Sequence, residues 1–103
     1  MKKINENEFN NEVANGFALV DFFGAGCMNC KMLEPTLEKL EKEFSGIKFL
    51  KLDTAETPAL NKKFGITSLP AVFLIKDGEV AGNFVGLKPQ GVIVRLIKEI
   101  FGV

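Results

Sequence analysis

The feature that most constrains the fold is the run Phe17–Phe23, which is apolar throughout except for Asp21. An apolar run of this length, followed by the glycines at 24 and 26, is typical of a parallel strand buried on both faces. Such a strand needs helices on both sides of its sheet. The run therefore indicates an α/β domain with this strand near its centre.

The rest of the chain alternates helical and extended patterns. Asp77-Gly78 separates two apolar runs and is a strong signal for a hairpin. Pro58 suits the first position of a short helix, with Thr57 as its cap. We expect a single domain over 1–103, with a mixed central sheet of four to five strands and helices on both faces. The expected helices cover 6–15, about 27 or 28 to 44, 58 to about 64–65, and a last segment that Pro89 opens and that extends to 101. The expected strands cover 17–23, 47–53, 71–76 and 79–85, with a short leading strand near 2–4.

Within this pattern, two smaller expectations concern exposure. The last helix should bury one stripe of apolar side chains that begins at Val92 and ends at Phe101. Asp53, at the end of its strand, should be no more than a solvated residue.

Composition excludes several functions. Lys and Arg together number 13, as do Asp and Glu, so nothing favours a nucleic acid or an anionic membrane as partner. His is absent, which excludes Cys-His and Ser-His catalysis. The polar residues 5–8 stand where a leader peptide would need an apolar run. We therefore expect a cytoplasmic protein, in a compartment where thiols stay reduced.

The two cysteines, Cys27 and Cys30, stand between the apolar strand and the next helix. The first backbone N–H groups of a helix have no partner within it, and the helix dipole favours negative charge there. A Cys27 thiolate would be stabilised by about 0.3–2 kcal/mol at such a position. Because the thiolate is the attacking species in disulfide exchange, the pattern predicts a redox-active pair.

Three other interpretations of the pair stay open at this point. Both cysteines could be inert core residues. They could supply half of a zinc or iron–sulfur site, whose remaining ligands a second copy of the chain would provide. They could also form a purely structural disulfide, although so short a loop would stabilise the fold by only about 2 kcal/mol.

Several motifs together resemble the thioredoxin family. They run in the family's order over nearly the whole chain: 20–23, the cysteine motif 27–31, Pro35, 51–53, Leu69-Pro70, 77–80 and Val85-Gly86. The resemblance implies the thioredoxin fold and a protein-disulfide reductase without cofactor, in which Cys27 is the nucleophile and Cys30 resolves. It also implies a thioredoxin reductase and protein disulfides as partners, and we expect a monomer. Glutaredoxin-like or disulfide-isomerase activity is the redox alternative.

Two charged residues in the apolar strands are candidates for supporting roles. Burial would raise the pKa of Asp21 and let it exchange a proton near neutral pH, unless its carboxylate reaches water. The resemblance implies that Asp21 accepts the proton of Cys30. It also implies that Lys51 lies beside Asp21 and modulates its charge; the alternative is a lysine whose ammonium group only reaches solvent.

The resemblance further implies that Leu69-Pro70 is a cis-proline turn beside the cysteines. Pro70 offers no N–H and blocks metal capture, while the backbone at Leu69 can pair with an extended substrate. Gly86 would let another backbone segment approach closely. The expected docking surface consists of Gly26, Met28, Thr54, Leu69, Pro70, Val85 and Gly86.

The cysteine motif itself departs from the family's pattern. Thioredoxins usually have Trp before the first cysteine and Gly-Pro between the two, whereas this chain has Gly26 and Met28-Asn29. Asn29 frees one more N–H at the start of the helix than proline would. We therefore predict that this protein is less reducing than a relative with Gly-Pro.

Overall fold

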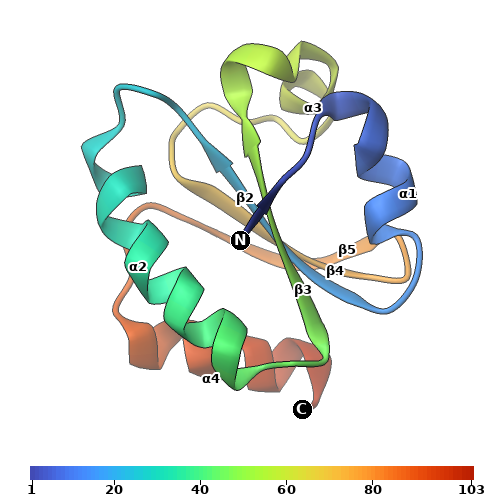
Figure 1. The fold of residues 1–103 in the computed structure, drawn as a ribbon, viewed down its shortest axis with the longest axis vertical. Coiled ribbons are helices and arrows are strands. Elements are labelled where there is room, and N and C mark those ends of the chain that lie inside the picture. The colour runs from blue at the N-terminus through green and yellow to red at the C-terminus, as the bar shows by residue number, and fades with distance from the viewer.

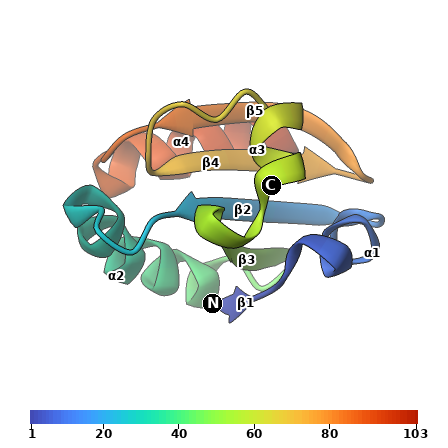
Figure 2. The same ribbon diagram turned by 90° about the horizontal axis from the view of Figure 1, so that it is seen from above.

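A five-stranded mixed sheet forms the middle of the molecule (Figure 1). The computed structural model describes all residues, 1–103. In spatial order the strands are β1 (Lys2–Lys3), β3 (Ile47–Asp53), β2 (Phe17–Phe23), β4 (Ala71–Lys76) and β5 (Glu79–Val85). The order can be followed from bottom to top in Figure 2. β2 pairs with β3 in parallel and with β4 in antiparallel fashion, so the predicted mixed sheet is confirmed.

Helices cover both faces of this sheet. α2 (Met28–Glu43) and α4 (Gln90–Phe101) lie on one side, while α1 (Phe9–Val13) and α3 (Pro58–Lys63) lie on the other (Figure 1). Two short 3-10 turns, η1 (Glu6–Glu8) and η2 (Thr54–Glu56), precede α1 and α3. None of these helices combines the length and the apolar character that crossing a membrane requires.

The side chains of β2 alternate between two apolar cores. Val20 and Phe22 belong to the core beneath α1 and α3, and Leu19 belongs to the core beneath α2 and α4. Because successive side chains of a strand point to opposite faces, Asp21 points to the same side as Leu19, toward α2. The strand thus delivers a carboxyl group to the layer in which the cysteines lie.

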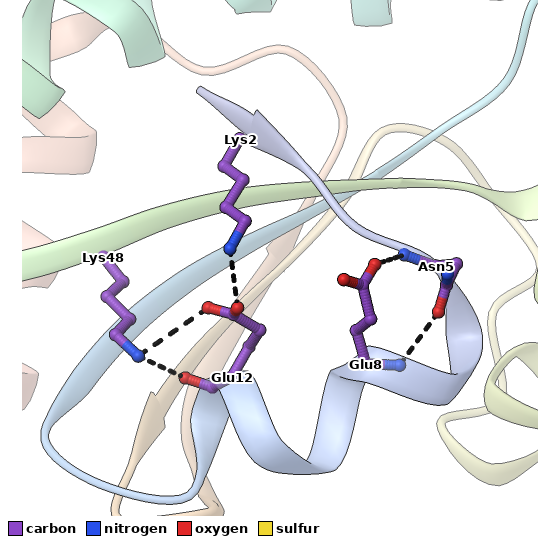
Figure 3. A network of polar contacts seen from close by, with 5 residues as sticks. All are labelled: Lys2, Asn5, Glu8, Glu12 and Lys48. Atoms are coloured by element: carbon purple, nitrogen blue, oxygen red, sulfur yellow. Dashed lines mark hydrogen bonds and ion pairs between the residues drawn. The ribbon is translucent and has the colours of Figure 1, made fainter.

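The first helix is shorter than the predicted 6–15. It begins as the 3-10 turn η1, where Asn5 and Glu8 cap each other through two hydrogen bonds of 2.9 Å (Figure 3). α1 then ends at Val13, and Gly16 has a φ of +78° that leads the chain into β2. The reciprocal cap explains why helical structure starts at Glu6 as predicted.

One smaller prediction is met in part, and two need correction. Thr57 stands at the N-cap position of α3 as predicted, but its side chain makes no capping hydrogen bond, and its buried hydroxyl donates to Asn61 Oδ1 at 2.8 Å instead. Asp53 is more than a solvated residue, since its Oδ1 accepts from the Ala55 N–H and caps η2. Val92 is 37% exposed and lies outside the buried stripe of α4, which consists of Ile93, Ile97 and Phe101.

Candidate active site

Cys27 and Cys30 form a disulfide at the start of α2, with their Cα atoms 5.3 Å apart. Cys27 is the residue that caps the helix: its backbone is extended, and its Sγ accepts a hydrogen bond from the Cys30 N–H at 3.1 Å. The predicted position of the pair, between the buried strand and the next helix, is confirmed. A thiolate at Cys27 would lie where a backbone donor and the positive end of the helix dipole both favour negative charge.

The two cysteines differ in access to solvent. Cys27 is half-buried, whereas Cys30 is only 4% exposed. Gly26 and Met28, on either side of Cys27, are both exposed, and Met28 is 68% exposed. A large partner can therefore reach the sulfur of Cys27 far more easily than that of Cys30.

A cavity of about 170 Å³ lies behind the disulfide. Asp21, Cys30, Glu34 and Lys51 contribute to its lining. Asp21 is 2% exposed, and its Oδ1 has no hydrogen-bond partner. The cavity thus holds the inner cysteine together with an unpaired buried carboxyl group.

The pKa of Asp21 is raised from 3.8 to about 7. Burial is the largest cause, because it removes the water that would stabilise the carboxylate. The negative charge of Glu34 raises the pKa further, while the positive charge of Lys51 lowers it. Asp21 can therefore gain or lose a proton near neutral pH, as expected from its place in the apolar strand.

Lys51 lies beside Asp21 in the sheet, since the two residues are in register on β3 and β2. Its ammonium group forms an ion pair with Glu34 and lies 5.8 Å from the centre of the Phe23 ring. The expected neighbourhood of the lysine and the aspartate is confirmed. The sequence does not predict the ion pair of Lys51 with Glu34.

Glu34 is the residue of this site that the sequence interpretation missed. It comes four residues after Cys30 on α2, which places both on one face of the helix. The spacing of four residues between Cys30 and Glu34 can be read from the sequence. It does not identify Glu34 as a site residue, because the sequence alone does not indicate that this part of α2 would meet Lys51.

The Leu69–Pro70 peptide bond is cis, as expected. The Gly86 N–H donates to the Pro70 carbonyl at 2.8 Å, and Val85 pairs with Ala71 in the sheet. Gly86 has a φ of +88°, which favours glycine at this position. The structure therefore brings together the four expected docking residues that lie at β4 and β5.

Gly24 connects this turn with the cysteine loop. A Cβ atom at Gly24 would lie 2.9 Å from Leu69 Cδ1, 3.8 Å from Thr54 Oγ1 and 4.0 Å from Cys27 Cβ. Thr54 also donates to the Phe23 carbonyl at 3.0 Å, which ties the end of β3 to the end of β2. Leu69 and Thr54 thus lie close to the loop that carries Cys27, Gly26 and Met28.

Comparison with known proteins agrees with this geometry. The thioredoxin family model matches residues 1–99. The thioredoxin of Chlamydia caviae is 38% identical over 99 residues, covering 96% of this chain and 97% of that protein. The thioredoxin of Bacillus subtilis is 35% identical over 94% of both chains. The oxidised form of mitochondrial thioredoxin 3 from Saccharomyces cerevisiae superposes with a TM-score of 0.87 at 32% identity, over 96% of this chain and 94% of that one.

The disulfide lies at the start of a helix, in a fold shared with solved thioredoxins, so the site and the fold agree with the sequence match. The paired cysteines stand where a thiol can ionise and a disulfide can form. The chain belongs to the thioredoxin family and is a protein-disulfide oxidoreductase.

Proposed function

We propose that this protein reduces disulfide bonds in other proteins, with Cys27 as the attacking residue and Cys30 as the resolving residue. The observation that carries this assignment is the contrast between the two sulfurs. Cys27 caps the helix and accepts the Cys30 N–H, while Cys30 is buried. An accessible, stabilised thiolate suits attack on a large substrate, and a buried thiol suits an intramolecular second step.

The proposed cycle has two exchanges. The Cys27 thiolate attacks one sulfur of the substrate disulfide, forms a mixed disulfide and releases the other substrate sulfur as a thiolate. Cys30 then loses its proton and attacks Cys27 Sγ. The Cys27–Cys30 disulfide forms, and the second substrate sulfur leaves. Two electrons pass from the protein to the substrate, which ends as a dithiol.

We assign the proton of Cys30 to Asp21. Both residues line the same cavity, and the pKa of Asp21 of about 7 lets its carboxylate accept a proton under neutral conditions. Lys51 supports this role by lowering the pKa of Asp21, which keeps part of the aspartate population ionised. Without that cation, the carboxyl group would be protonated over a wider pH range.

Substrates would dock along the surface formed by Gly26, Met28, Thr54, Leu69, Pro70, Val85 and Gly86. An extended segment of the substrate can pair with the backbone at Leu69, next to the cis-proline. Pro70 has no N–H, and a position next to the cysteines, as the family resemblance implies, would hinder a metal ion from binding both thiols. The exposed Met28 and Val85 side chains offer apolar contacts to such a substrate.

A thioredoxin reductase would return the oxidised protein to the dithiol form, and the protein would therefore act as an electron carrier. We propose that it does so as a monomer. The cytoplasm is the compartment in which such a cycle runs, because thiols there stay reduced. No cofactor of the protein's own is needed, since the cysteine pair itself carries both electrons.

Insulin reduction tests the assignment. Wild type, Cys27→Ser and Cys30→Ser are assayed with dithiothreitol and with a bacterial thioredoxin reductase. We expect turnover only for wild type, and stable mixed disulfides with insulin only for Cys30→Ser. Trapping by Cys27→Ser instead would reverse the two roles, and full activity of either variant would contradict the cycle.

A further inference from the structure

The ion pair between Glu34 and Lys51 changes the electrostatics of the cavity. Lys51 is in register with Asp21, yet its ammonium group pairs with Glu34, and no ion pair joins it to Asp21. The Glu34 and Lys51 side chains are 35% and 24% exposed and both line the cavity, so their pair lies where the cavity meets solvent. Asp21 is left inside with an Oδ1 that has no partner.

We propose that Glu34 is a positioning residue for the resolving step: it holds the Lys51 ammonium at the mouth of the cavity, adds a second carboxylate beside Asp21, and so moves proton exchange between Asp21 and Cys30 to higher pH. This inference rests on the proposed role of Asp21 as proton acceptor. Glu34 itself does not need to touch a reacting sulfur. It acts through Lys51 and Asp21.

The charges around Asp21 come from two elements. α2 contributes Glu34 and also Lys31, which lines the cavity, and β3 contributes Lys51. On the opposite side, the residue in register with Asp21 on β4 is Val72, which carries no charge. The negative charge of Glu34 raises the pKa of Asp21, and the positive charge of Lys51 lowers it.

One cation therefore serves two carboxylates. When Glu34 is ionised and bound to Lys51, their charges largely cancel, and ionising Asp21 adds an uncompensated negative charge to a buried cavity. A neutral residue at position 34 would remove the repulsion and would also free Lys51 to approach Asp21. Both effects favour the Asp21 carboxylate, so they act in the same direction.

The experiment measures the titration of Asp21 directly and compares it with the reaction. In the reduced protein, the side-chain carboxyl ¹³C shift of Asp21 is followed from pH 4 to pH 10 in wild type and Glu34→Gln. The pH dependence of kcat for insulin reduction is recorded in parallel. We expect the Asp21 midpoint to fall by about one pH unit in Glu34→Gln, and the acidic limb of the kcat profile to move with it.

Further variants separate charge from shape. Glu34→Lys should lower the midpoint more than Glu34→Gln, and Glu34→Asp, which keeps the charge, should stay close to wild type. Glu43→Gln is the matched control, because Glu43 is an exposed residue of the same helix without an ion pair. It should leave the midpoint and the profile unchanged. Thermal unfolding establishes that each variant is folded.

The outcomes also distinguish this inference from the function on which it rests. If Asp21→Asn keeps the wild-type rate and pH profile of kcat, Asp21 is not the proton acceptor. The proposed role of Glu34 is then overturned as well. If Asp21→Asn slows the reaction while Glu34→Gln leaves the Asp21 midpoint unchanged, only the role of Glu34 is overturned.

Discussion

Asp21 and Lys51 lie directly opposite each other on neighbouring parallel strands, and no ion pair joins them. The lysine binds Glu34 instead, and the aspartate stays buried with an unpaired oxygen. A buried carboxyl group without a partner favours the neutral form and penalises the folded state once it ionises. The group proposed to serve the chemistry therefore weakens the fold at high pH.

The first prediction concerns Asp21→Asn and the pH dependence of stability. The folded-state pKa of Asp21 is raised from 3.8 to about 7. The contribution of this carboxyl group to the free energy of unfolding is therefore fully present below pH 3.8, and it is lost as the pH rises through about 7. The loss amounts to at most about 4 kcal/mol. Asparagine does not ionise, so the stability of the variant relative to wild type should rise between pH 4 and pH 8 and then level off.

Urea unfolding of the oxidised proteins at several pH values measures this difference. The trend with pH matters rather than the offset, since the asparagine amide adds a constant change of its own. Glu99→Gln, an exposed change on α4, should run parallel to wild type. If the Asp21→Asn curve also runs parallel to wild type, the carboxyl group is not perturbed as described.

Local signals explain why much of the fold could be predicted. The apolar run of β2 and the Asp77-Gly78 turn between β4 and β5 each depend on residues that are adjacent in the sequence. The three strands β2, β4 and β5 have the predicted bounds. The beginning of α2 at the cysteine motif followed from the residue pattern, and the cis bond before Pro70 followed from the family's motifs. These features depend little on how the helices pack against the sheet.

The features that could not be predicted depend on tertiary contacts. The hydroxyl of Thr57 turns inward because Asn61 offers an acceptor there. Glu34 joins the site because the packing of α2 brings it next to β3, which no periodicity in the sequence specifies. The division of the first helix into η1 and α1 likewise depends on the fold around it.

The second prediction concerns the departure at Asn29. Residue 29 lies in the first turn of α2, beside the Cys30 N–H that binds Cys27 Sγ. Asn29→Pro removes one backbone donor from the end of the helix that favours the Cys27 thiolate. The reduced form should lose stability, and the reduction potential should become more negative by about 10–30 mV.

Equilibration with a glutathione buffer and quantification of both redox forms measure this potential. The Cys27 pKa, followed by the rate of alkylation against pH, should rise in the same variant. Met28→Gly, which keeps every backbone donor, is the matched control and should change the potential less. A less negative potential for Asn29→Pro would contradict the proposed stabilisation of the thiolate by the helix.

The third prediction compares two neighbouring residues of α2. Leu33 is completely buried in the core between α2 and the sheet, whereas Met32 is 55% exposed. Leu33→Ala should leave a cavity and reduce the free energy of unfolding by about 2–5 kcal/mol. Met32→Ala should change it by no more than about 0.5 kcal/mol. Urea unfolding at pH 7 checks both values, and similar losses for the two variants would mean that α2 is rotated differently against the sheet.

The fourth prediction concerns the ion pairs that join β1, α1 and β3 (Figure 3). Glu12 Oε2 binds Lys2 Nζ at 2.8 Å, and Glu12 Oε1 lies 3.7 Å from Lys48 Nζ. The hydrogen bond with Lys2 lowers the pKa of Glu12 and raises that of Lys2. Because its pKa is lowered, the Glu12 carboxylate stabilises the folded protein at pH values above the usual pKa of 4.5. This stabilisation is lost as the pH falls.

Glu12→Gln should therefore lower the melting temperature slightly at pH 7 in low salt and have little effect at pH 3. The difference at pH 7 should shrink in 1 M NaCl, where the screening length is about 3 Å. The effect should stay small throughout, because Lys2 is 59% exposed and Lys48 still donates to the Glu12 backbone carbonyl at 3.0 Å. Glu43→Gln, which breaks no ion pair, provides the baseline. A loss in Glu12→Gln that is equal at both salt concentrations would show that the side chain contributes by packing rather than by charge.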